Sequence, residues 1–141
     1  SKDYIFDIER FTSFEGNTVP YILYTIVRIQ SILSRLAQEQ NLLAGQERIR
    51  PAYSKSESDL MLEIAKFNEA ISIAYKEMSP HRICQYIYEI ADSFNTFYHG
   101  NRIIDEEDEE KKASWVSLIT IVRDVLLTCI DLLAIEAPDK M

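Results

Sequence analysis

The chain has 141 residues, 47% of them hydrophobic and 27% charged, which is the size and balance of one globular domain. Its 3 glycines and 4 prolines argue against collagen, low-complexity linkers and a turn-rich β-sandwich, and they favour long helices. Its 2 cysteines are too few for a disulfide framework, so we expect a reducing cytoplasm. No apolar run is long enough to span a membrane. Because the chain starts at Ser1 without an initiator methionine, we expect a fragment of a longer protein.

The formal net charge of −8 disfavours nucleic acid, because surfaces that bind phosphates are usually basic. Six of the negative charges lie in the run 105–110, however, so the rest of the chain is nearly neutral. A local basic or aromatic site therefore stays open.

The N-terminal part of the chain predicts a short helix over residues 3–14, with Phe6 and Phe11 packed inward. A first long helix is predicted from near Thr18, because Thr is a good N-cap and Pro20 fits a first helical turn. Gly45 predicts its end. Its apolar residues recur at helical spacing: Ile22, Ile26, Ile29, Leu33 and Leu36.

Residues 44–55 are predicted to form a loop, and a second long helix follows Ser56, with Asp59 completing a weak capping box. Its apolar face is Leu60, Ile64, Phe67, Ile71 and Ala74. Ser79 and Pro80 predict the N-cap and first residue of a third helix, with an apolar face of Ile83, Ile87, Ile90, Phe94 and Phe97.

A fourth helix is predicted to follow the acidic run and to end at Pro138. Its inward residues are expected to be Leu118, Ile121, Val122, Val125, Leu126, Cys129 and Leu132. Carboxylates suit the start of a helix, and the run lacks the spacing and glycine of an EF-hand, so we expect no metal site there. The sequence therefore predicts one all-α domain over 1–141, a bundle of four long helices plus a short N-terminal helix.

No constellation of catalytic residues is present. The glycines are isolated, so no phosphate-binding loop is formed, and there is no CxxC motif. His81 and Cys84 are three residues apart, but only His99 and Cys129 remain to complete a zinc site. We expect both cysteines to pack in the core and assign no catalytic and no metal-binding residue.

The first long helix carries a second face. At about 100° per residue, Tyr21, Tyr24 and Arg28 lie within roughly 60° of each other and roughly 140° from the apolar stripe. Aromatic rings can stack on unpaired bases and a guanidinium can bind phosphate. The alternative is that the tyrosines cover a neighbouring helix or domain. On the third helix, Asn95 points away from the apolar arc and Tyr98 lies at its edge, so both can present polar groups beside buried rings.

Three segments resemble the C-terminal anticodon-binding domain of arginyl-tRNA synthetases. The first is Phe14-Glu15-Gly16-Asn17-Thr18, followed by Pro20-Tyr21, Tyr24 and Arg28-Ile29. The second is the helix from Pro80 to Tyr98, with its Phe94-Asn95-Thr96-Phe97-Tyr98 end, and the third is Leu132 to Met141. The segments occur in the family's order, and the resemblance covers nearly the whole chain.

The resemblance implies a class I synthetase that uses ATP and Mg²⁺ to attach arginine to its tRNA, with catalytic motifs in a domain outside this chain. The fragment is then inactive alone, needs no cofactor, and has the tRNA(Arg) anticodon loop and the parent's own catalytic domain as partners. Residues that the resemblance assigns to the pocket for the central cytosine and its neighbour are Tyr21, Tyr24, Arg28, Tyr98 and Met141. Asn95 is added as a candidate from its position beside them.

Two other interpretations stay open. The chain can be the same type of helical domain attached to another synthetase, such as the glycyl enzyme's β subunit. It can also be a helical protein–protein module whose tyrosine face is a partner interface.

Overall fold

The computed structural model describes residues 2–42 and 48–136, and the side chains of residue 16, residues 18–42 and residues 48–135. Within these residues the chain forms five helices and no strand. They are α1 (Lys2–Gln40), α2 (Lys55–Ala65), α3 (Phe67–Glu77), α4 (Pro80–Gly100) and α5 (Glu109–Glu136). The all-α bundle predicted from the sequence is confirmed.

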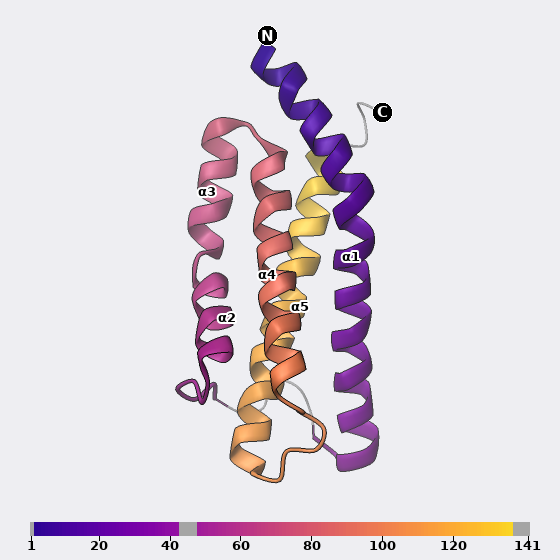
Figure 1. Ribbon diagram of the computed structural model, residues 1–141, viewed down its shortest axis with the longest axis vertical. Helices are drawn as coiled ribbons and strands as arrows, with labels where there is room; N and C mark the ends of the chain where they lie inside the picture. The colour runs from indigo at the N-terminus through magenta and orange to yellow at the C-terminus, as the bar shows by residue number, and fades with distance from the viewer. Residues whose placement is uncertain (1, 43–47, 137–141) are drawn as a thin grey trace.

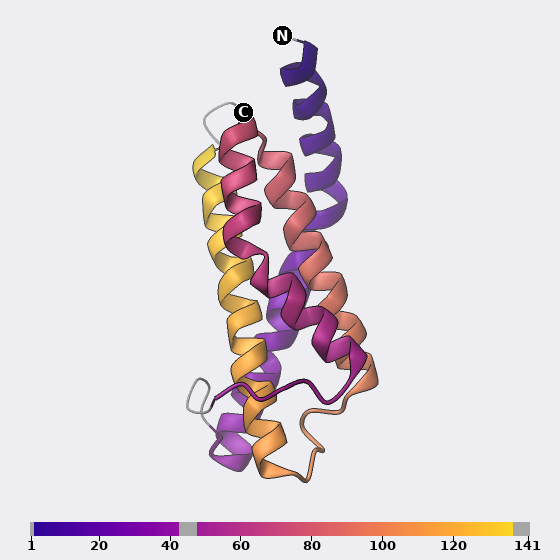
Figure 2. The same cartoon turned by 90° about the vertical axis from the view of Figure 1, so that its left-hand side faces the viewer.

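Helix α4 is the centre of the bundle. It contacts each of the other four helices, and α5 also packs against α1. Figure 1 shows α1 on one side of α4 and the α2–α3 pair on the other. The first turns of α1 extend beyond the ends of the other helices (Figures 1 and 2).

Helix α1 is continuous from Lys2 to Gln40 and contains Pro20 in its interior. The predicted start near Thr18, after a separate short helix, was therefore wrong. Proline removes one helical hydrogen bond, to the carbonyl of Gly16, but both Gly16 and Pro20 are exposed, so water can satisfy this carbonyl. Helix α1 changes direction along its length in Figure 1, as helices with an interior proline usually do. The side chains of Phe6 and Phe11 lie outside the described part.

The end of α1 is formed by Asn41, which adopts the left-handed conformation with φ 56°. The Leu42 N–H donates to the Leu36 carbonyl oxygen at 3.2 Å, so the chain after Asn41 folds back on the last turns of α1. Helix α1 thus ends at Gln40, before the predicted stop at Gly45, which lies outside the described residues.

Helix α2 begins two residues earlier than predicted, with Ser54 as its N-cap. The Glu57 N–H donates to Ser54 Oγ at 3.2 Å, and the Tyr53 N–H donates to Glu57 Oε1 at 2.8 Å. This is a close relative of the capping box, formed by Ser54 and Glu57 instead of Ser56 and Asp59.

The predicted second long helix is interrupted at Lys66, which ends α2 and precedes α3. The Tyr86 hydroxyl on α4 donates to the Glu63 carbonyl oxygen at 2.8 Å and lies 3.3 Å from that of Ile64. The Glu63 carbonyl also accepts from the Lys66 N–H at 3.2 Å, so the Tyr86 hydroxyl adds a partner from another helix at the interruption. Burial raises the pKa of this tyrosine.

Helix α4 starts where the sequence predicted, whereas α5 starts at Glu109, inside the acidic run that was expected to precede it. Ser79 is the N-cap of α4 and Pro80 is its first residue. Helix α5 starts within the acidic run, where Asp108 Oδ1 accepts bonds from the backbone N–H groups of Glu110 and Lys111, each at 3.1 Å. The run therefore includes the cap of α5.

The core consists of the predicted apolar faces and a few further residues. Those buried as predicted on α1 and α4 are Ile22, Ile26, Ile29, Leu33, Leu36, Ile83, Ile87, Ile90, Phe94 and Phe97. On α5, Ile121 is 37% exposed, contrary to prediction, and Trp115, Val116 and Ile119 are buried instead. The Trp115 ring meets the edge of the Phe97 ring with centroids 5.6 Å apart. Over the described residues, no helix combines the length and apolar character needed to cross a bilayer.

Candidate nucleic-acid interface

Five of the six residues predicted for the site come together where α1 packs on α4. Helix α1 supplies Tyr21, Tyr24 and Arg28, and α4 supplies Asn95 and Tyr98. We call these five residues the α1–α4 cluster. The two helices are far apart in the sequence but pack side by side, so the cluster depends on tertiary structure.

Arg28 is at the centre of the cluster. Its guanidinium carbon lies 4.9 Å from the centroid of the Tyr24 ring and 4.7 Å from that of Tyr98, within the range of cation–π attraction. Its Nη1 donates to Asn95 Oδ1 at 2.7 Å, and its Nη2 donates to the Tyr24 hydroxyl at 3.0 Å. The arginine is therefore held between two aromatic rings from different helices.

Asn95 lies in the helix interface and is only 8% exposed. Its Nδ2 donates to the Tyr21 hydroxyl at 3.0 Å, to Thr25 Oγ1 at 3.1 Å and to the Ala91 carbonyl oxygen at 3.0 Å. The expectation that Asn95 points away from the buried face was wrong. Its amide is turned into the α1–α4 contact and bonds α1 residues.

The tyrosines of the cluster differ in exposure. Tyr24 is 59% exposed, whereas Tyr21 and Tyr98 are half-buried. Burial raises the pKa of Tyr21. The Tyr98 ring stacks on Phe94 with centroids 6.0 Å apart, which ties the cluster to the core. The prediction that Tyr21, Tyr24 and Arg28 are not sealed in the bundle centre is confirmed.

Two further residues belong to this neighbourhood and were missed in the sequence. Tyr88 of α4 lies beside Tyr21, with ring centroids 5.7 Å apart, and Thr25 donates from Oγ1 to the Tyr21 carbonyl oxygen at 2.9 Å. Tyr88 is exposed and Thr25 is buried. Tyr21 lies on α1 and Tyr88 on α4, so their contact depends on how these two helices pack and could not be predicted from helical spacing. The sixth predicted residue, Met141, lies outside the described residues.

The other candidate groups do not form a site. Cys84 and Cys129 are buried, as predicted, and burial raises the pKa of Cys129 to about 12. Across residues 2–42 and 48–136, no three His, Cys, Asp or Glu side chains are grouped so that they could hold a metal ion. In the acidic run, the pKa of Glu106 is lowered chiefly by a bond from the Asp108 backbone.

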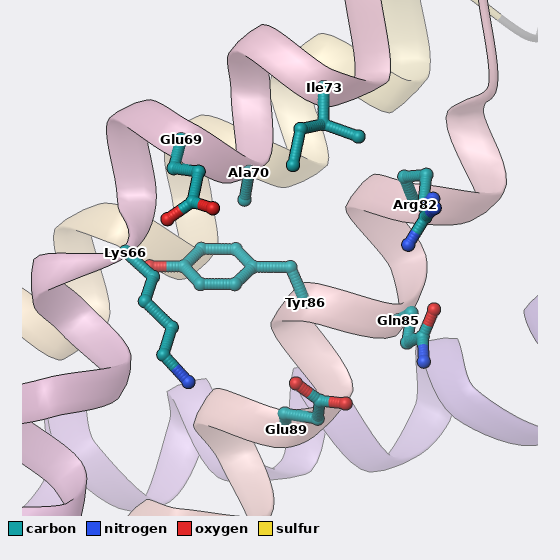
Figure 3. A pocket seen from close by; sticks show the side chains of 8 residues that line it. All are labelled: Lys66, Glu69, Ala70, Ile73, Arg82, Gln85, Tyr86 and Glu89. Carbon is teal, nitrogen blue, oxygen red and sulfur yellow. The ribbon is translucent and has the colours of Figure 1, made fainter. Parts of the chain in front are cut away.

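A hollow lies between α3 and α4, away from the cluster (Figure 3). The Tyr86 ring crosses its middle, and side chains of both helices and of the α2–α3 junction surround it: Lys66, Glu69, Ala70, Ile73, Arg82, Gln85 and Glu89. Its positive and negative groups balance, and Arg82 Nε is bonded to Glu77 Oε2 at 2.8 Å. The hollow therefore offers no net positive charge for a phosphate.

Residues 22–141 match the family model described as "DALR anticodon binding domain". The chain is 56% identical over 142 residues to the arginine–tRNA ligase of Agathobacter rectalis and 53% identical over 141 residues to that of Alkaliphilus oremlandii. Each match covers 100% of this chain but 24% of the relative. The chain is also 35% identical over 144 residues to an arginine–tRNA ligase of Francisella tularensis. This match covers 100% of the chain and 25% of that relative.

Proposed function

The chain belongs to the DALR anticodon-binding domain family, and from that premise we propose that its α1–α4 cluster binds the unpaired anticodon bases of a tRNA(Arg). The observation that carries this proposal is the exposed Tyr24 ring beside the guanidinium of Arg28, at the junction of α1 and α4. Anticodon bases must unstack before they are read, and the protein then supplies new stacking partners.

Three residues of the cluster and Met141 have stated roles in this proposal. Tyr24, which is 59% exposed, offers a ring face for stacking, at about 1–3 kcal/mol per base. Tyr98, whose ring stacks on Phe94 and lies against Arg28, supports the guanidinium from the side of α4. Arg28 binds a phosphate or a base edge with guanidinium donors not used by Asn95 and Tyr24. Met141, at the end of the chain, supplies an adaptable apolar wall. A few such contacts are sufficient to bind an RNA loop despite the net charge of −8.

The chain spans about a quarter of the length of its relatives, so the activity of the whole protein is part of the proposal. We propose that the parent is an arginine–tRNA ligase of the cytoplasm. ATP and Mg²⁺ would act in its catalytic domain, outside this chain, and this domain would be a second partner of the chain. The chain alone would bind RNA and catalyse nothing. The two high identities favour this over a glycyl-type synthetase or a protein–protein module.

The test is binding of the 141-residue chain to two synthetic RNA hairpins, measured by fluorescence anisotropy at low and at physiological salt. One hairpin has the anticodon stem-loop of a tRNA(Arg), and in the other the central anticodon base is changed. We expect at least about tenfold tighter binding to the first, because a lost base contact leaves a polar group unpaired. Equal binding to both hairpins, or binding to neither, would favour the protein–protein module.

Substitutions within the cluster localise the binding. Tyr24→Ala and Arg28→Ala are each expected to weaken binding to the matched hairpin by roughly tenfold, with unchanged helicity by circular dichroism. Tyr75→Ala is the matched control, because Tyr75 on α3 is 62% exposed, close to the exposure of Tyr24, and lies outside the cluster. If Tyr24→Ala or Arg28→Ala melts the chain at moderate temperature, that residue has a structural role and the proposed site is wrong.

A further inference from the structure

We propose that Asn95 is a positioning residue, which fixes Arg28 and Tyr21 for binding and does not itself contact RNA. Its side chain is the only one of the α1–α4 cluster that is buried, at 8% exposed. One amide thus bonds two residues of the adjoining helix that belong to the same cluster, Arg28 through Oδ1 and Tyr21 through Nδ2.

The orientation of the amide is fixed by its partners. Arg28 has only donors, so the group that faces its Nη1 at 2.7 Å must be the Asn95 oxygen. The Ala91 carbonyl has only acceptor capacity, so the group that faces it at 3.0 Å must be the Asn95 nitrogen. A flipped amide would place donor against donor and acceptor against acceptor. The bonds to α1 therefore have a single consistent arrangement.

These bonds occupy the donors and the oxygen of the Asn95 amide, which leaves little hydrogen-bonding capacity for RNA. Its two N–H groups are shared among Tyr21, Thr25 and Ala91, all within 3.1 Å. Its oxygen accepts the charge-assisted bond from Arg28, which is stronger than a neutral one. A base could reach this amide only by displacing α1 residues. Asn95 is thus placed to orient the groups that face outward.

Orientation matters because Arg28 is a long side chain with many rotamers. Holding it between the Tyr24 and Tyr98 rings before RNA arrives removes part of the ordering cost of binding. Without Asn95, the guanidinium keeps its contacts with the two rings but loses the hydrogen bond at Nη1 that fixes its orientation between them. We therefore expect Asn95→Ala to weaken RNA binding through Arg28 and Tyr21.

The first test reads Arg28 directly in the chain without RNA. In the NMR spectrum we expect hindered guanidinium rotation in the wild type, and loss of this hindrance in Asn95→Ala. Asn95→Ser is the second variant, because its hydroxyl can still bond the Ala91 carbonyl within α4 but is too short to reach α1. Asn101→Ala is the control, since Asn101 bonds Phe97 and Ser56 at the end of α4 and does not bond Arg28. Unchanged Arg28 signals in both Asn95 variants would overturn the inference.

The second test uses the matched hairpin and rests on the proposed function. Asn95→Ala is expected to weaken binding roughly tenfold in the wild type, but less than about twofold in an Arg28→Ala/Tyr21→Phe background, where its bonds to the two cluster residues on α1 are already removed. A loss of the same size in both backgrounds would mean that Asn95 contacts the RNA itself and would overturn the inference. If the wild type fails to bind the hairpin, the proposed function fails, while the NMR measurement still decides the role of Asn95.

Discussion

Arg28 is the residue on which the proposed RNA recognition depends most. The guanidinium is fixed by one buried amide, one tyrosine hydroxyl and two ring faces. A lysine in its place would offer a point charge without the planar group that stacks between the rings. The affinity expected of this cluster therefore comes from stacking and orientation more than from the number of charges.

Cys129 is a free cysteine that packs in the core as a small hydrophobic residue. Its pKa is raised from 9.0 to about 12 by burial. Because the folded state holds the proton more tightly than the unfolded state, the stabilisation is fully present below about pH 9 and is lost as the pH rises toward 12.

This shift predicts a loss of stability in mild alkali. Between pH 8 and pH 10 we expect the wild type to lose about 1 kcal/mol more in its free energy of unfolding than Cys129→Ala. Urea unfolding of both proteins at each pH measures this difference, and the other groups that titrate are common to both. Equal losses would show that the thiol is not buried as described.

At the scale of elements, the joint between α3 and α4 holds a strained residue. Met78 has φ 49° and ψ 45°, the left-handed conformation that side chains other than glycine adopt at a cost. Its side chain is 84% exposed, so it gains little from packing. The backbone at this position needs glycine-like freedom, and the methionine has no compensating contact with the core.

Met78→Gly is therefore expected to stabilise the protein by about 0.5–1 kcal/mol, which raises Tm by about 2–4 °C. Thermal unfolding followed by circular dichroism measures the change. Lys76→Gly, in the right-handed part of α3, is the control and should lower Tm, because glycine weakens a helix interior. A lower Tm for Met78→Gly would mean that the methionine side chain is a structural contact.

The elements that were predicted correctly are those with strong local signals. The Ser79-Pro80 start of α4 and the apolar faces of α1 and α4 follow from spacing alone. The start of α1 was wrong because Thr18 and Pro20 carry the same signal as a true N-terminus, while continuation of the helix depends on whether the proline faces water. The interruption at Lys66 is stabilised by Tyr86, a residue of another helix, and no local pattern contains it.

The candidate site was predicted more completely than the helix bounds. Helical spacing brought Tyr21, Tyr24 and Arg28 to one face and placed Tyr98 at the edge of another, and the family resemblance assigned them to one pocket. The burial of Asn95 and the presence of Thr25 and Tyr88 were not foreseen, because they depend on how α4 sits against α1. The roles of all these residues in RNA binding remain predictions.

At the scale of the whole molecule, the acidic run and the α1–α4 cluster lie on different segments. The run lies between the end of α4 and the first turn of α5, whereas the cluster residues lie within α1 and α4. With a net charge of −8 and one arginine in the cluster, the chain resembles no general phosphate binder. We expect a shallow salt dependence, in keeping with release of one or two counterions.

The central claim is that unpaired bases bind where α1 packs on α4. Titration of the isotopically labelled chain with the matched hairpin, followed by backbone and aromatic NMR shifts, tests it most directly. We expect the largest shifts at Tyr21, Tyr24, Arg28 and Tyr98, with small changes around the hollow lined by Lys66, Glu69 and Arg82. The largest shifts at that hollow or along the exposed face of α5, with the cluster unmoved, would contradict it.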